Sequence, residues 1–186
     1  MTNERPIHVL GISGSLRNSS YNTALLRAAE ELIPAGMTLE IVNLAGIPVF
    51  NVDEEIPFPK AVEELRSAIA AADAVLIATP EYNSSISGAL KNALDWVSRS
   101  PQPPLTGKPV ALIGARTGMF GTARAQVQLR QVLPHLGALV LPKPEVMVAK
   151  AQEVFDENGR LTSEATRGFL QDLLTKLATW TWQVTH

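Results

Sequence analysis

The chain has 186 residues, of which 46% are hydrophobic and 18% charged, and its formal net charge is −2. This length and apolar content predict a single packed domain over residues 1–186 and exclude a largely disordered chain. The 16 basic and 18 acidic residues leave no basic surplus for nucleic acid. The absence of cysteine excludes disulfides, Fe–S clusters and thiol nucleophiles.

Five short apolar runs predict strands, and segments of helical periodicity separate most of them. The predicted strands are residues 7–12, 38–43, 74–79, 110–114 and one within 139–148, which Pro142 and Pro144 interrupt. The predicted helices are residues 23–33, 61–72, 86–99, 122–136 and 162–182. Proline-rich loops are expected over residues 47–59 and 100–109.

Strands that alternate with helices, and that are apolar throughout, predict a parallel sheet covered on both faces. Five strands in a chain of this length fit a three-layer, doubly wound α/β fold better than a barrel, which needs about 250 residues. Ligands of such folds bind at the carboxyl ends of the strands, near the point where the strand order reverses. We therefore expect the site in the loops after the first, third and fourth strands.

The N-terminus lacks the basic start and long apolar stretch of a signal peptide, and no run approaches the roughly 18 apolar residues of a membrane span. A cytoplasmic protein without membrane association is therefore expected. The three histidines, His8, His135 and His186, have no metal-ligand spacing, so no metal site is expected.

The loop after the first strand has the composition of a phosphate site. Small residues allow its N–H groups to converge, the following helix contributes its positive N-terminal end, and Arg17 adds a planar cation. Further donors are the hydroxyls of Ser13, Ser15, Ser19 and Ser20. The alternative is a solvent-exposed turn in which Ser20 or Asn22 caps the helix.

Other phosphate and nucleophile motifs are absent from this loop. It has neither the GxxxxGK[ST] pattern of nucleotide hydrolases nor the GxGxxG pattern of dinucleotide-binding folds. It also lacks the GxSxG turn that presents a nucleophilic serine, which disfavours acyl transfer.

The loop after the third strand, TPEYNSSISG (79–88), combines an aromatic ring with amide and hydroxyl groups. Tyr82 and Asn83 are expected where a ligand bound at the first loop would extend. They suit a flat heterocycle with a hydrogen-bonding edge. The alternative is that Tyr82 is an ordinary rim residue and that Ser85 or Ser87 caps the next helix.

Together, GSLRNSSYN and PEYNSSISGALKNALDW resemble the NADPH-dependent FMN reductase family of flavodoxin-like proteins. The loop GARTGMFG (114–121) extends the resemblance, which runs from Val9 to about Val148 and is closest to the chromate and quinone reductase branch. The chain departs from that branch at Ala115, where serine is frequent. The resemblance implies a three-layer flavodoxin-like fold with a five-stranded parallel sheet.

The resemblance also implies a set of FMN-binding residues. The FMN phosphate would be held by Ser13, Ser15, Arg17, Ser20 and Asn22. The isoalloxazine ring would be bordered by Pro80, Glu81, Tyr82 and Asn83, and its pyrimidine edge by Arg116, Thr117 and Gly118. Arg116 is additionally interpreted either as a site for the extra phosphate of NADPH or as a solvated side chain.

The implied function is an NAD(P)H oxidoreductase with bound FMN. NADPH or NADH would pass hydride to FMN and leave, and a quinone, flavin, azo compound or chromate would then accept electrons in the same cleft, a ping-pong mechanism. The flavin performs the chemistry, so no side chain is expected to be catalytic. The family resemblance implies a homodimer or homotetramer, with Trp96 either at an interface or in the core. Trp180 and Trp182 would pack between subunits or onto the sheet.

The sequence alone leaves two alternatives open. A flavodoxin-type electron carrier would bind FMN without oxidising NADPH itself, but such carriers are strongly acidic and this chain carries a charge of only −2. A non-flavin phosphate binder would use the first loop alone.

Overall fold

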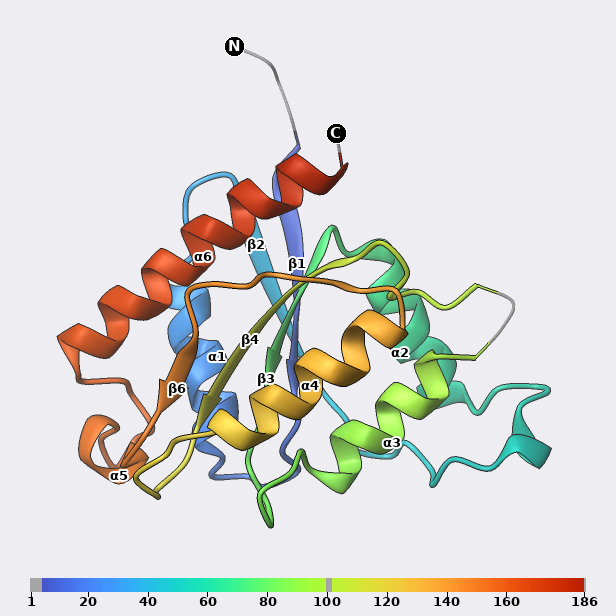
Figure 1. Ribbon diagram of the computed structural model, residues 1–186, viewed down its shortest axis with the longest axis horizontal. Coiled ribbons are helices and arrows are strands. Elements are labelled where there is room, and N and C mark those ends of the chain that lie inside the picture. Colours follow the sequence, from blue (N-terminus) through green and yellow to red (C-terminus); the bar gives the residue numbers. More distant parts are fainter. Residues whose placement is uncertain (1–4, 100–101, 186) are drawn as a thin grey trace.

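Parallel strands in the order β2-β1-β3-β4-β5 form the central sheet of the computed structural model, which describes residues 5–99 and 102–185 (Figure 1). The strands are β1 (Ile7–Ser13), β2 (Met37–Asn43), β3 (Ala74–Ala78), β4 (Pro109–Ala115), β5 (Leu139–Val140) and β6 (Val146–Val148). This strand order is that of the flavodoxin-like fold, with the reversal between β1 and β3. The predicted doubly wound α/β class is confirmed.

The predicted fifth strand is divided into β5 and β6, and both pair with β4, so the sheet has six strands rather than five. Pro142 and Pro144 lie between the two short strands. Because proline has no N–H to donate to a ladder, the pairing stops there and resumes at Val146.

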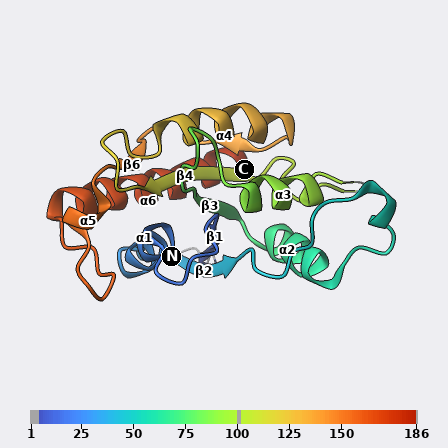
Figure 2. The same ribbon diagram turned by 90° about the horizontal axis from the view of Figure 1, so that it is seen from below.

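Helices cover both faces of the sheet. The helices are α1 (Tyr21–Glu31), α2 (Lys60–Ala71), α3 (Gly88–Val97), α4 (Ala123–His135), α5 (Ala151–Val154) and α6 (Glu164–Thr185). Side chains of α1 and α6 pack on one face, and those of α2, α3 and α4 pack on the other (Figure 1, Figure 2). All residues of β3 are buried, as expected for a strand with helices on both sides.

Several element ends differ from the predictions because caps decide them. Ser20 caps α1, which therefore begins at Tyr21 rather than at residue 23, and Ser87 caps α3. The short helix α5 was not predicted, and a 3-10 turn (Val52–Glu54) lies in the predicted 47–59 loop. Of the loop predicted over 100–109, residues 100 and 101 lie outside the described residues.

The tryptophans have different environments. Trp96 is fully buried, and its Nε1 donates to the Pro48 carbonyl at 2.9 Å, so it belongs to the core. Trp180 donates from Nε1 to the Leu139 carbonyl at 3.0 Å and packs against the hydrophobic core between the sheet and the helices α1 and α6. Trp182 is 56% exposed.

No helix in the described part of the chain combines the length and apolarity that crossing a membrane requires. Within residues 5–99 and 102–185, no group of three or more histidine, aspartate and glutamate side chains is arranged to hold a metal ion.

Asp73 provides a pH-dependent contact at the amino end of β3. The Arg5 guanidinium donates two hydrogen bonds of 2.7 Å to it and the His8 N–H donates one of 2.8 Å, and these bonds hold the pKa of Asp73 below its usual range. A lowered folded-state pKa stabilises the fold above the unfolded-state pKa of about 4 and stops doing so as the pH falls through the folded-state value. We expect Asp73→Asn to lower the free energy of unfolding at pH 7 and to change it least at pH 3, measured by urea denaturation. Equal effects at both pH values would contradict this assignment.

Candidate functional site

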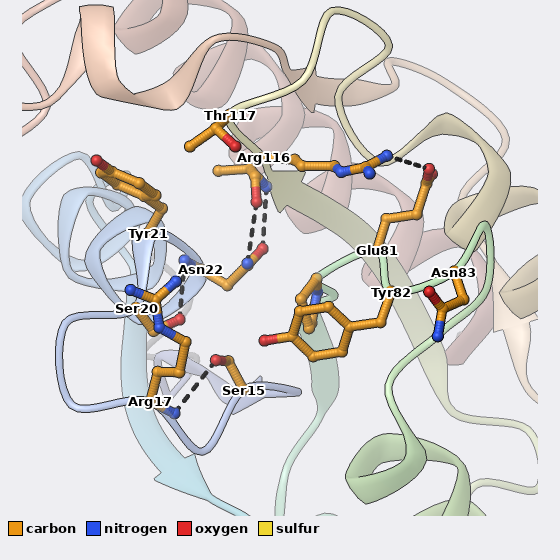
Figure 3. Close-up of a pocket in the computed structure, with 12 residues that line it drawn as sticks. Ser15, Arg17, Ser20, Tyr21, Asn22, Glu81, Tyr82, Asn83, Arg116 and Thr117 are labelled. Carbon is orange, nitrogen blue, oxygen red and sulfur yellow. Dashed lines mark hydrogen bonds and ion pairs between the residues drawn. The ribbon is translucent and has the colours of Figure 1, made fainter.

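A cavity of about 460 Å³ opens at the carboxyl ends of β1, β3 and β4, beside the strand-order reversal (Figure 3). The parallel register brings these ends to one edge of the sheet, because Ser13 lies opposite Ala78 and Ala78 opposite Ile113. The lining residues are Ser15, Arg17, Ser20, Tyr21, Asn22, Pro80, Glu81, Tyr82, Asn83, Ala115, Arg116 and Thr117.

Every predicted site residue except Ser13 and Gly118 lines this cavity. Ser13 is fully buried, and its hydroxyl is 2.8 Å from that of Thr23. The carbonyl of Gly118 accepts a hydrogen bond from the Lys150 N–H at 3.3 Å, so this residue joins the loop after β4 to the start of α5. The lining residues Tyr21 and Ala115 were not predicted, although Tyr21 lies between two residues that were.

The end of the cavity at α1 carries a donor set suited to a phosphate. The Ser20 hydroxyl oxygen accepts from the N–H groups of Asn22 and Thr23, which leaves its own proton to donate. Ser15 is 5% exposed, and Arg17 is exposed beside it. Two hydroxyls, a guanidinium and the N-terminus of an 11-residue helix fit the phosphate of FMN.

Asn22 connects this end of the cavity to β4. Its Nδ2 donates to the Ala115 carbonyl at 3.1 Å, and its Oδ1 accepts from the Ala115 N–H at 2.9 Å (Figure 3). The side-chain amide therefore satisfies both backbone hydrogen-bonding groups of Ala115, the last residue of β4. We assign Asn22 a positioning role, since both ends of its amide already have backbone partners.

Tyr82 lies in a tight hairpin turn across the cavity. Its N–H and carbonyl exchange hydrogen bonds of 3.0 and 2.9 Å with Ser85, while Asn83 and Ser84 have φ values of 50° and 62°. Two consecutive left-handed residues are typical of a type I′ turn. In Figure 3 the Tyr82 hydroxyl points toward the Ser15 side of the cavity and Asn83 lies beyond the ring. Asn83 lines the cavity, and its left-handed backbone conformation forms the turn.

The same turn is fastened to α4. Arg124 donates from Nη1 to the Ser84 hydroxyl at 2.9 Å. Gln128 donates to the Ser84 carbonyl at 3.2 Å and lies 2.6 Å from the Ser85 hydroxyl. These side-chain contacts hold the Tyr82 ring at one wall of the cavity.

Glu81 is a buried carboxylate that joins three elements. It accepts from Arg116 Nη1 at 2.7 Å and from the N–H groups of Arg124 and Ala125 at 3.0 and 3.2 Å. The carboxylate thus lies at the N-terminus of α4, where the helix dipole favours a negative charge. Arg116 is paired with Glu81, although Arg124 Nη1 also lies 3.6 Å from the same carboxylate, so one negative charge is shared by two cations. This pairing partly compensates Arg116 and weakens its interpretation as a site for the extra phosphate of NADPH.

We expect Glu81→Gln to lower the free energy of unfolding by about 2–3 kcal/mol, since a buried charged acceptor is replaced by an amide that adds an unpaired donor. Glu153→Gln is the control, because Glu153 forms an exposed pair with Lys150 and should change stability by less than about 1 kcal/mol. Urea denaturation measures both. Similar losses in the two variants would show that Glu81 is not a structural anchor.

Two glycines allow the loops to approach closely. A Cβ on Gly14 would lie 3.1 Å from both the Ala78 carbonyl oxygen and the Pro80 Cδ, and the Ser87 hydroxyl donates to the Gly14 carbonyl at 2.6 Å. A Cβ on Gly114 would lie 2.6 Å from the Thr79 carbonyl oxygen. Gly114 was not among the predicted site residues, although an isolated glycine in an apolar strand signals close backbone approach.

Comparisons with known proteins agree with this geometry. A family model described as NADPH-dependent FMN reductase matches residues 7–153. An NAD(P)H-dependent FMN reductase of Pseudomonas aeruginosa is 53% identical over 175 residues, which cover 94% of this chain and 95% of that protein. A quinone reductase of Escherichia coli K12 is 41% identical over 173 residues, covering 91% and 92% of the two chains.

Among solved structures, FerB, a flavoenzyme NAD(P)H:(acceptor) oxidoreductase from Paracoccus denitrificans, superposes with a TM-score of 0.87. The sequence identity is 34%, and the alignment covers 95% of this chain and 97% of that chain.

Proposed function

The chain belongs to the NADPH-dependent FMN reductase family and is an enzyme, and from this premise we propose that its cavity binds FMN and serves hydride transfer from NADPH or NADH to quinones. The observation that carries the proposal is the composition of the cavity. Phosphate donors lie at one end, around Arg17, and an aromatic wall lies at the other, around Tyr82. Quinones are the acceptor class because a quinone reductase is among its relatives.

The proposed binding residues have distinct tasks. Ser15, Arg17 and Ser20 bind the phosphate and thereby set the depth of the cofactor in the cavity. The Tyr82 ring and Thr117 border the flat ring system on either side. Asn22 and Glu81 act indirectly, since they hold β4, α1 and α4 in the arrangement that forms the cavity.

Bound FMN supplies the reversible acceptance of hydride that no side chain of this cysteine-free protein provides. The chain contributes position and electrostatics. Donor and acceptor must both reach the ring system beside Tyr82, so they would use this cavity in turn. This alternation is the structural basis for the proposed ping-pong kinetics.

The test is reconstitution with FMN followed by turnover. Protein carrying FMN should absorb near about 450 nm, and anaerobic NADPH should bleach that band. Addition of 1,4-benzoquinone should restore it. Steady-state initial rates plotted against NADPH concentration in double-reciprocal form, at several fixed quinone concentrations, should give parallel lines.

Two results would contradict the proposal. Protein that takes up no FMN would exclude the flavin assignment and favour a simple phosphate binder. Protein that takes up FMN but oxidises NADPH only when a separate reductase is added would be an electron carrier.

We further propose that the chain forms a homodimer or homotetramer, as the family resemblance implies. Light scattering of the FMN-loaded protein measures this directly, and a mass near the monomer's 20.0 kDa would contradict it.

A further inference from the structure

A second cavity, of about 310 Å³, adjoins the first at its phosphate end. The two cavities share Arg17, Ser20 and Tyr21. The second continues along α1 past Ala24 to Arg27, and its far wall is the turn Asp156–Gly159. A group attached covalently to a phosphate in the first cavity would therefore enter the second directly.

The side chain of Arg27 lines the second cavity but not the first, and it carries a positive charge. Tyr21, Ala24 and Arg27 follow one another at three-residue steps, which places them on one face of α1. Among residues 5–99 and 102–185, no side chain forms an ion pair or hydrogen bond with the Arg27 guanidinium. Arg17 and Arg27 together suit two linked phosphates, whereas a phosphate monoester in the first cavity needs only Arg17.

The far wall is an ordered turn and carries acceptors. Asp156 Oδ1 accepts from the N–H groups of Asn158 and Arg160 at 2.9 and 2.8 Å. The turn lies against α1, because the Phe155 and Tyr21 rings are 5.4 Å apart (Figure 2). The carboxylates of Asp156 and Glu157 suit the hydroxyl groups of a ribose, which acidic side chains bind in other nucleotide sites.

We propose that this second cavity binds the adenosine monophosphate half of FAD, so that the protein accepts FAD as well as FMN. Arg17 binds the phosphate of the FMN half, Arg27 binds the second phosphate, and the acidic turn binds the ribose. This inference rests on the proposed function, because the FMN half of FAD must occupy the first cavity.

The test compares FMN and FAD binding to apoprotein by isothermal titration calorimetry. The wild type should bind FAD with a Kd within tenfold of that for FMN. Arg27→Gln should weaken FAD binding five- to tenfold and leave the FMN Kd within twofold, while Arg27→Lys should restore most of the FAD affinity. Arg160→Gln is the matched control, because Arg160 directly follows the turn Asp156–Gly159 but does not line the cavity. It should leave both affinities within twofold.

Each contrary result has a distinct meaning. Wild-type protein that binds FMN but binds FAD more than tenfold more weakly would overturn the inference and leave the proposed function intact. Failure to bind FMN would overturn both. Equal weakening of FAD by Arg27→Gln and Arg160→Gln would show a general charge effect, and equal weakening of FMN and FAD by Arg27→Gln would place Arg27 at the first cavity. Either result would overturn the second site.

Discussion

Arg17→Ala is expected to weaken FMN binding by about 1.5–3 kcal/mol, which corresponds to a roughly 10- to 150-fold higher Kd. The reason is the loss of a charge-assisted hydrogen bond to the phosphate, because Arg17 is the cation beside the N-terminus of α1 among the described residues that line the first cavity. Titration of apoprotein with FMN, followed by flavin fluorescence, measures the change.

Two further variants make this result specific. Arg17→Lys keeps the charge but not the planar pair of donors, so an intermediate Kd is expected. Arg160→Ala removes an exposed cation that lines neither cavity, and its Kd should match that of the wild type. An FMN Kd that is unchanged by Arg17→Ala would refute the phosphate assignment.

Gly114→Ala is expected to lower the free energy of unfolding by about 2–3 kcal/mol, because the added methyl group overpacks a site with no room. The new Cβ would lie 2.6 Å from the Thr79 carbonyl oxygen and 2.9 Å from Thr122 Cβ. The Thr79 backbone cannot easily retreat, since its N–H donates to the Ile113 carbonyl at 2.9 Å. A lower urea midpoint with an unchanged m-value is the expected observation.

Gly88→Ala is the matched control for this substitution. Gly88 is the first residue of α3, and a Cβ there would have nothing within 4 Å. Alanine favours a helix over glycine by up to about 1 kcal/mol, so this variant should be as stable as the wild type or slightly more stable. Equal midpoints for Gly114→Ala and the wild type would mean that β4 and the residue 122 region shift apart readily.

Local patterns were sufficient to predict much of the fold. The apolar run of β3 and the three- and four-residue spacing in α1 are properties of the segments themselves, because burial on one or two faces dictates which positions must be apolar. The interruption at Pro142 and Pro144 was also visible, since a missing N–H acts locally. That both halves pair with β4, as β5 and β6, depends on the neighbouring strand and was not visible.

The candidate site was partly visible for the same reason. The loops around Arg17 and Tyr82 carry local motifs, and the fold brings both to one cavity. The partners of Asn22 and Glu81 were not predictable, because Ala115 and the start of α4 are distant in sequence. Both residues were predicted to contact FMN, and their contacts within the chain add a positioning role.

The sequence by itself determined the alternation of strands and helices, the absence of thiol chemistry and the three loops that carry the site, since each of these depends on residue type and local spacing. Only the tertiary structure decided which polar groups remain available to a ligand. It pairs Arg116 with Glu81, bonds the amide of Asn22 to the backbone of β4 and leaves Arg27 in the lining of a second cavity. The physical reason is that a hydrogen bond or ion pair removes a group from ligand binding only when folding brings its partner near.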